Sequence, residues 1–272
     1  MSASITPTTQ VLEDSFVYSC SFDHQRGYEQ FLPHHILSFQ ISGETHIQHQ
    51  NGLLILKENQ MVLSRRNQLA KTKKIPAQDQ AYKSISVLLS DEVLRKFAVE
   101  ANLKVSKKYT GNPLLLIEPD ALLKSYFQSL LPYVEESRPI NQKLAALKLN
   151  EAIELLLNLN PALRNFLFDF SAPYKIDLEK FMLQNYHYNV PIAQFAILSG
   201  RSLAAFKRDF QQVFQVSPRK WLQEKRLLEA HDLLQQKKRK PTEIYLELGF
   251  ENLSHFYTAF KQKFGITPAN IQ

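Results

Sequence analysis

Two stretches of the sequence repeat each other at an interval of 50 residues: SLAAFKRDFQQVFQVSP at residues 202–218 and NLSHFYTAFKQKFGITP at residues 252–268. One leucine and three phenylalanines recur at identical offsets, and each copy ends in a hydroxyl residue followed by proline. Upstream, FAILSG at residues 195–200 matches IYLELG at residues 244–249 at an interval of 49. A repeat of this length indicates two copies of one supersecondary unit.

Each copy has the boundary signals of a helix, a turn and a second helix. Three pairs of residues at matching places carry these signals: Pro191 and Pro241 open the first helix, Gly200 and Gly249 end it, and Ser202 and Asn252 cap the second helix. Proline is tolerated in a first helical turn, glycine often ends a helix, and hydroxyl or amide side chains cap helix N-termini. The sequence therefore predicts helix-turn-helix units at about 190–215 and 241–265, joined by a helix that begins at Ser217 and Pro218.

The second helix of each copy has an apolar face and a polar or small face. The apolar faces hold Leu203, Phe206, Phe210 and Phe214 in the first copy, and Leu253, Phe256, Phe260 and Phe264 in the second. The opposite faces hold Ala204, Lys207, Arg208 and Gln211 in the first copy, and Ser254, Tyr257, Thr258 and Lys261 in the second. A helix that is buried on one side and projects a short polar face fits the DNA major groove. Two such faces can lie about one DNA turn (~34 Å) apart.

The positive charge of the chain is concentrated in its last part. Residues 175–272 hold 15 Lys and Arg against 9 Asp and Glu, a net charge of +6 out of +7 for the whole chain. A basic domain favours an anionic partner, with nucleic acid as the first hypothesis and an acidic membrane surface or protein as the alternative. The basic run at residues 237–240 either touches phosphate or is a solvated loop between helices.

Short strands and tight turns dominate the first 110 residues. Alternating or compact apolar runs predict strands at 36–41, 45–47, 53–56, 61–63 and 84–89. Asn51 and Gly52 form a hairpin signal, and Ser90 is placed to cap a helix. We expect a small β-barrel or sandwich here, with a cupin-like barrel as the favoured form.

Helical periodicity follows Pro119, with predicted helices over about 122–130 and 142–158. The second helix has a wide apolar stripe that includes Leu149, Ile153 and Leu156. An apolar stripe does not show which surface covers it, so these residues either pack on their own barrel or form a dimer interface. Residues 161–173 are expected to be a linker, docked by Phe166, Phe168 and Phe170.

Other kinds of site have little support in the sequence. His24, His34, His35, His46 and His49 lie in the expected barrel, but they lack the spacing of a three-ligand metal site. His46 and His49 differ by three residues, so on one strand they would face opposite sides. We expect no metal, no cofactor and no enzymatic activity. With one cysteine, no apolar span and no signal peptide, we expect a cytoplasmic protein.

The last 98 residues resemble the DNA-binding domain of the AraC/XylS family of bacterial transcription regulators. The matching stretches are 195–200, 202–210, 217–218, 226–234 and 248–268. The N-terminal half is similar in layout to the barrel-like regulatory domains of the type III secretion activators. The resemblance implies an α+β protein of two domains: residues 1–160 for regulation or dimerisation, a linker at 161–173 and a DNA-binding domain at 174–272.

The resemblance also implies which residues contact DNA. They are Ser202, Ala204, Lys207, Arg208 and Gln211 in the first unit, and Leu253, Ser254, Tyr257, Thr258 and Lys261 in the second. Two residues depart from the family: Tyr245 stands where a small alanine is usual, and Thr258 where arginine is common. We therefore expect sequence discrimination from Lys207 and Arg208.

The resulting hypothesis is a transcription regulator, by family analogy an activator that meets RNA polymerase. A small molecule, a protein partner or homodimerisation would control it through the N-terminal domain. The alternatives are a cupin-type barrel enzyme and a non-specific DNA-binding protein.

Overall fold

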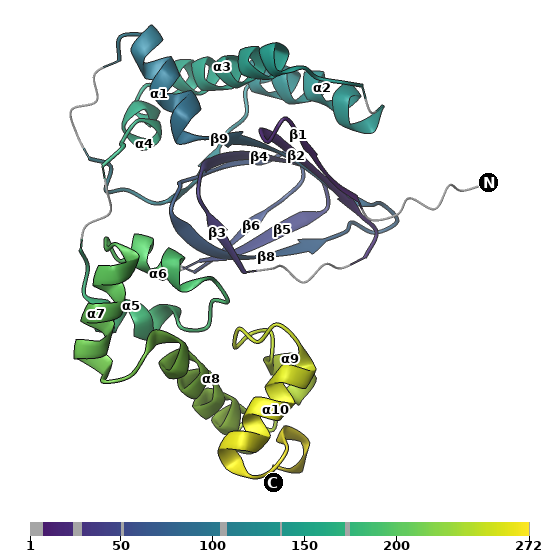
Figure 1. Cartoon of the computed structure of the whole chain (residues 1–272). Coiled ribbons are helices and arrows are strands. Elements are labelled where there is room, and N and C mark those ends of the chain that lie inside the picture. Colours follow the sequence, from purple (N-terminus) through teal and green to yellow (C-terminus); the bar gives the residue numbers. More distant parts are fainter. Residues whose placement is uncertain are drawn as a thin grey trace. The chain divides into compact units, whose positions relative to one another are not determined.

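The chain divides into two compact units, Met1–Ser171 and Ala172–Gln272. The computed structural model describes residues 8–23, 29–49, 52–103, 108–136, 138–171 and 175–271. The first unit combines two β-sheets with helices, and the second unit is all-helical (Figure 1). The predicted fold class is confirmed.

The described residues of the first unit form ten strands. They are β1 (Thr8–Leu12), β2 (Phe16–Ser21), β3 (Glu29–Leu32), β4 (His35–Ser42), β5 (Glu44–His49), β6 (Gly52–Leu56), β7 (Met61–Ser64), β8 (Gln68–Ile75), β9 (Tyr82–Leu89) and β10 (Leu114–Ile117). One sheet has the order β1-β2-β9-β4-β7-β10 and the other β3-β8-β5-β6, with antiparallel neighbours throughout. The sheets face each other like the walls of a barrel (Figure 1). The predicted strands are present, and Gly52 begins β6, whereas Asn51 lies outside the described residues.

The six-stranded sheet separates two packing regions. In β9, the alternate residues Ile85, Val87 and Leu89 are buried with the helices, as the period of two requires. On the other face of β9, Tyr82 hydrogen bonds to Thr45 of β5 in the opposite sheet (2.7 Å). A small apolar cluster that draws on both sheets fills part of the space between them: Leu32, Ile47, Leu56, Val62, Ala70 and Leu114.

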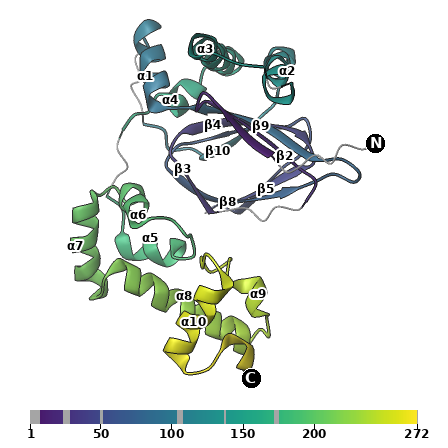
Figure 2. The ribbon, with the colours of Figure 1, turned by 45° about the vertical axis from the view of Figure 1, so that its right-hand side comes forward.

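In the described part of the first unit there are four helices: α1 (Asp91–Glu100), α2 (Ala121–Glu135), α3 (Gln142–Leu159) and α4 (Leu163–Leu167). Ser90 caps α1, as predicted, by accepting a hydrogen bond from the Val93 amide (3.2 Å). Helices α2 and α3 lie over the outer face of the six-stranded sheet (Figure 2). Their apolar sides form the main core of this unit.

Two predictions about this region need correction. Leu149, Ile153 and Leu156 are buried in the core of their own unit, so they are not available as dimer contacts. The linker predicted at 161–173 contains helix α4, and Phe166 and Phe168, which were expected to dock it, are buried in that core, so this segment belongs to the first unit. Both differences have one cause: an apolar stripe specifies burial, but it does not specify the surface that covers it.

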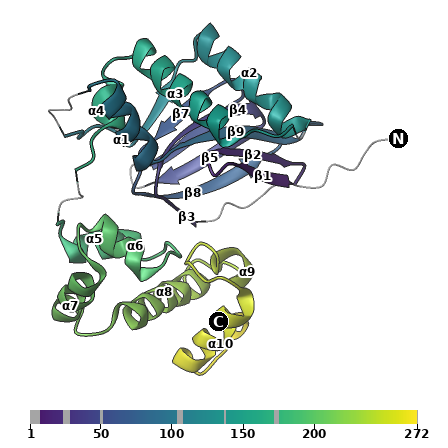
Figure 3. The same cartoon turned by 45° about the horizontal axis from the view of Figure 1, so that its top comes forward.

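Six α-helices and one short 3₁₀ helix form the described part of the second unit. They are α5 (Leu178–Asn185), α6 (Ile192–Leu198), α7 (Leu203–Phe214), α8 (Pro218–Gln235), α9 (Pro241–Ile244), α10 (Leu253–Phe264) and η1 (Pro268–Asn270). Helices α6 and α7 form the first helix-turn-helix unit, and α9 and α10 form the second. Helix α8 runs between them (Figure 3).

The two helix-turn-helix units differ in the length of their first helices, α6 and α9. The sequence predicts that the helix opened by Pro241 runs to Gly249, but α9 ends at Ile244 and residues 245–249 form turns. The turn that follows is nevertheless alike in both: the Phe250 amide donates to the Tyr245 carbonyl (2.9 Å), as the Arg201 amide donates to the Ala196 carbonyl (2.9 Å) in the first helix-turn-helix unit. Tyr245 is the bulky residue at this point, and its side chain packs against the local core.

Candidate nucleic-acid interface

Helix α7 presents the polar face that the sequence predicts. Its start is fixed by Ser202, whose hydroxyl accepts a hydrogen bond from the Ala205 amide (3.2 Å). Phe206 and Phe210 are fully buried on the inner side. The predicted contact residues Ala204, Lys207, Arg208 and Gln211 are all exposed on the outer side.

Helix α10 has the same construction with different polar groups. Asn252 caps it by accepting from the His255 amide (2.7 Å). Ser254, Thr258 and Lys261 are exposed, whereas Leu253 and Tyr257 are partly buried against the local core. The Thr258 hydroxyl donates to the Ser254 carbonyl (3.0 Å), so it can only accept from a further partner.

A carboxylate organises the inner edge of α7. Asp209 pairs with Lys175 (2.9 Å), Arg201 (3.1 Å) and, more loosely, Arg208 (3.5 Å). Hydrogen bonds from Lys175 and then Arg201 lower the pKa of Asp209 to about 2. Arg208 keeps a side chain that is 69% exposed, while Lys207 forms no ion pair within the part of the chain that the structure describes. Both cations on the outer face therefore remain accessible to an anionic partner.

Arg201 shapes the candidate interface, and the sequence reasoning missed it. Its guanidinium, 7% exposed, donates to the carbonyls of Ile176 (2.9 Å) and Ser199 (2.8 Å) as well as to Asp209. It thus fixes the turn before α7. The available signal is an arginine between the turn glycine and the helix cap, eight residues before an aspartate.

Helix α8 carries each helix-turn-helix unit on a different half. Trp221, near its start, contacts the rings of Phe210 (5.7 Å) and Phe214 (4.6 Å) of α7. Near its end, His231 contacts the rings of Phe260 (6.4 Å) and Phe264 (4.8 Å) of α10. The repeated phenylalanines thus pack both α7 and α10 against α8. This helix of 18 residues is about 27 Å long.

One residue of the basic run at 237–240 forms ion pairs within the chain. Arg239 forms a two-pronged ion pair with Glu247 (2.7 and 3.1 Å) and lies 3.9 Å from Glu243. This interaction ties the loop to the turn after α9. For Lys237, Lys238 and Lys240, both expectations, phosphate contact and solvated loop, stay open.

The described histidines of the first unit lie in separate surroundings. His35 is fully buried beside Phe166, and burial, followed by the nearby Arg66 and Arg65, lowers its pKa to about 3. His46 hydrogen bonds to Glu44 (2.9 Å), and His24 lies outside the described residues. Among the described residues, no three His, Cys, Asp or Glu side chains form a group that could hold a metal ion.

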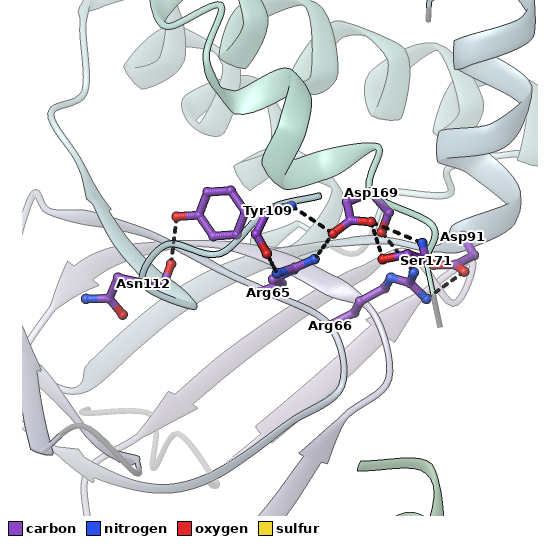
Figure 4. A network of polar contacts seen from close by, with 7 residues as sticks. All are labelled: Arg65, Arg66, Asp91, Tyr109, Asn112, Asp169 and Ser171. Atoms are coloured by element: carbon purple, nitrogen blue, oxygen red, sulfur yellow. Dashed lines mark hydrogen bonds and ion pairs between the residues drawn. The ribbon is translucent and has the colours of Figure 1, made fainter. Parts of the chain in front are cut away.

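A polar network occupies the end of the first unit (Figure 4). Arg65 donates to the carboxylate of Asp169, and Arg66 donates to Asp91 (2.9 Å) and to the Asp169 carbonyl (3.0 Å). Burial raises the pKa of Asp169, but hydrogen bonds, led by the one from Ser171, outweigh burial and lower it to about 2. The network joins the β7–β8 turn to the last residues of the N-terminal unit. We interpret its role as structural, because it holds these two segments together.

Comparisons with known proteins cover both units. A family model described as a helix-turn-helix domain matches residues 195–272, and one described as the ExsA N-terminal regulatory domain matches residues 35–166. Within the described residues, none of the helices has both the length and the apolar character that crossing a membrane requires.

Individual relatives are similar over part of their length. The virulence regulon transcriptional activator VirF of Yersinia enterocolitica is 34% identical over 169 residues, which is 60% of each chain. The transcriptional regulator ExsA of Pseudomonas aeruginosa is 34% identical over 128 residues, or 46% of each chain. The matches thus span less than two thirds of these relatives. The crystal structure of ToxT from Vibrio cholerae aligns at 16% identity over 94% of this chain and 96% of its own, with a TM-score of 0.43.

Proposed function

The chain belongs to the AraC family of helix-turn-helix proteins, and on that premise we propose that it is a sequence-specific DNA-binding regulator of transcription that acts as an activator. The observation that carries the proposal is the pair of capped helices, α7 and α10, with exposed polar faces on one basic unit. Each helix would enter one of two adjacent major-groove segments.

The residues divide into base-reading and backbone-holding groups. Arg208 and Lys207 are the candidates for sequence discrimination, because an accessible guanidinium can bind guanine in a bidentate manner. Ala204 and Gln211 complete the first reading face. In the second unit, Ser254, Tyr257 and Thr258, with Leu253 beside them, would make weaker contacts.

Phosphate contacts would position the two helices on the duplex. Lys261 is exposed on α10 and offers a point charge, and Ser202 lies at the start of α7 with its hydroxyl already used as a cap acceptor. Such contacts carry no sequence information but supply much of the affinity, and they weaken with salt because bound cations release counterions.

The N-terminal unit, Met1–Ser171, would regulate the C-terminal unit, Ala172–Gln272, through a small molecule, a protein partner or dimerisation. If the effector is an anionic small molecule, Lys74 would be a candidate contact, because it reaches from β8 to Ser19 of the other sheet (2.9 Å) and burial lowers its pKa. RNA polymerase would be the partner at the promoter, in the cytoplasm, since an activator must act on the polymerase.

A homodimer remains part of the proposal, with different contact residues from those first expected. Leu147 on α3 is 58% exposed, whereas Leu149, two residues on, is 4% exposed. Leu147→Asp should therefore yield a folded monomer in analytical ultracentrifugation, and Leu149→Asp should disrupt the fold. A wild-type chain that sediments as a monomer at micromolar concentration would remove dimerisation from the proposal.

Selection of bound sites from a randomised duplex library tests the proposed function. The full chain is used at about 150 mM salt, where non-specific phosphate binding is weak. We expect an enriched motif with two parts about one helical turn apart. Binding without any enriched motif would indicate the non-specific alternative, and no DNA binding would reopen the enzyme alternative.

A further inference from the structure

The space between the two helix-turn-helix units is not closed by apolar packing alone. Each unit packs on its own half of α8: Phe210 against Trp221 in the first, and Phe256 and Phe260 with Leu227 in the second. Between them lies a cavity of about 550 Å³, lined by residues 189–192 of the first unit, by α8 and by residues 249–251 of the second. Contacts that cross this cavity can therefore help to fix one unit against the other.

One side chain of α8 reaches both units across this space. The Arg226 guanidinium donates from Nε to the Tyr186 carbonyl, from Nη2 to the Tyr188 carbonyl and from Nη1 to the Gly249 carbonyl, each at 2.8 Å. The first two carbonyls precede α6 of the first unit, and the third belongs to the turn before α10 of the second. The guanidinium is planar and rigid, so its three bonds hold these segments in one arrangement.

The turn of the second unit is shaped around this contact. Gly249 has φ +81°, a conformation that other residues rarely adopt. A Cβ atom there would lie 2.8 Å from the His187 carbonyl oxygen and 2.9 Å from Arg226 Cζ. Glycine is therefore required both by the backbone conformation and by the close approach of the two units.

We infer that Arg226 is a positioning residue that sets the distance and rotation between α7 and α10, and thereby the spacing of the two DNA segments that the protein accepts. The inference rests on the proposed function. Inserting one base pair between the segments separates them by about 3.4 Å and rotates one by about 35° around the duplex axis. A fixed pair of recognition helices tolerates one spacing, whereas a loosened pair tolerates several.

The experiment measures the affinity of the full chain for a set of duplexes. Each duplex carries the motif recovered by selection, with one or two base pairs inserted or deleted between its two parts. For the wild type, a change of one base pair should weaken binding about tenfold or more, because one set of base contacts is lost. For Arg226→Lys, the difference should shrink to about threefold, because one ammonium cannot bond three carbonyls in the geometry of a guanidinium. Binding to a duplex with only the first part of the motif should not change.

Arg219→Gln is the matched control. Arg219 lies on the same helix, lines the same cavity and is exposed. Its loss removes one positive charge and should weaken binding at all spacings alike, with the wild-type spacing preference retained. Gly249→Ala should broaden the preference as Arg226→Lys does, because the added Cβ displaces the guanidinium from the other side.

The outcomes separate this inference from the proposed function. A wild type without a two-part motif would contradict the proposed function. A wild-type spacing profile in Arg226→Lys would contradict only the role of Arg226. Unfolding of Arg226→Lys in a thermal melt would also contradict it, because the apolar contacts of each half of α8 are expected to hold the fold without the guanidinium.

Discussion

The two helix-turn-helix units share their apolar contacts but differ in the charges at matching positions. Phe210 and Phe260 occupy the same place in the repeat, and both are fully buried against α8. Arg208, by contrast, is matched by Thr258, and the ion-paired Asp209 is matched by the buried Ala259. The fold of the unit thus depends on the residues that stayed alike, and the outer surfaces were free to differ.

The difference assigns separate tasks to the units. The first unit displays two accessible cations on α7 and fixes that helix with a carboxylate and Arg201. The second displays hydroxyl groups at the positions that match these cations, carries Lys261 and Lys263 in the last turn of α10 instead, and holds that helix by apolar packing. Base discrimination would therefore come mainly from α7, while α10 would mainly position the protein on the duplex.

The largest expected effect tests the shared packing. Phe210→Ala and Phe260→Ala should each lower the unfolding free energy by about 3–5 kcal/mol, since each removes a fully buried ring. Chemical denaturation followed by the fluorescence of Trp221, the one tryptophan of the chain, reports on this unit. A loss in one variant without a comparable loss in the other would show that the two units are not packed alike.

The next effect tests the division of tasks. Arg208→Ala should weaken binding to the selected motif by about 1–3 kcal/mol and relax the preference at one base position. Thr258→Ala, the matched change in the second unit, should cost less than about 1 kcal/mol, because its hydroxyl already donates to the Ser254 carbonyl. Competition binding with single-base variants of the motif measures both, and an equal loss in the two variants would reject the division.

A smaller effect tests the helix caps. Ser202→Ala and Asn252→Ala should each reduce stability by about 1 kcal/mol, because each leaves an amide of the first helical turn without its acceptor. Thermal unfolding measures the loss, with Ala204→Ser as a control that changes an exposed helix position beside one cap. If either cap variant melted with the wild type, that side chain would not act as a cap.

Local patterns in the sequence predicted much of the fold. The strands around 36–41 and 84–89 follow from alternation, and the boundaries of α7 and α10 follow from their caps. Strand β8 was missed because lysines at Lys71, Lys73 and Lys74 interrupt its apolar pattern. Strand alternation and helix caps depend on residues that are close in sequence, so both can be recognised from the sequence.

Contacts between distant residues could not be predicted in the same way. Arg65 and Asp169 are 104 residues apart, and nothing in their surroundings pairs them. Arg226 looks like one basic residue among several in α8, and its three carbonyl partners have no side-chain signature. The exposed residues of α7 and α10 were predictable because a repeat shows its own inner and outer faces; their contacts with DNA stay a prediction.

Acid should loosen α7 before α10, because among the described residues a carboxylate holds the recognition helix of the first helix-turn-helix unit and none holds that of the second. The pKa of Asp209 is lowered from 3.8 to about 2, so its contacts with Lys175 and Arg201 stabilise the fold fully above about pH 4 and are lost as the pH falls through about 2. Ala259 occupies the matching place in α10 and does not titrate, and the Arg239–Glu247 pair of that unit lies beside α9 instead. Hydrogen-exchange protection factors at pH 4.5 and about pH 2.5 should therefore fall more in α7 than in α10. In Asp209→Asn the difference between the helices should already be present at the higher pH, and an equal fall in both helices of the wild type would show that the carboxylate does not hold α7.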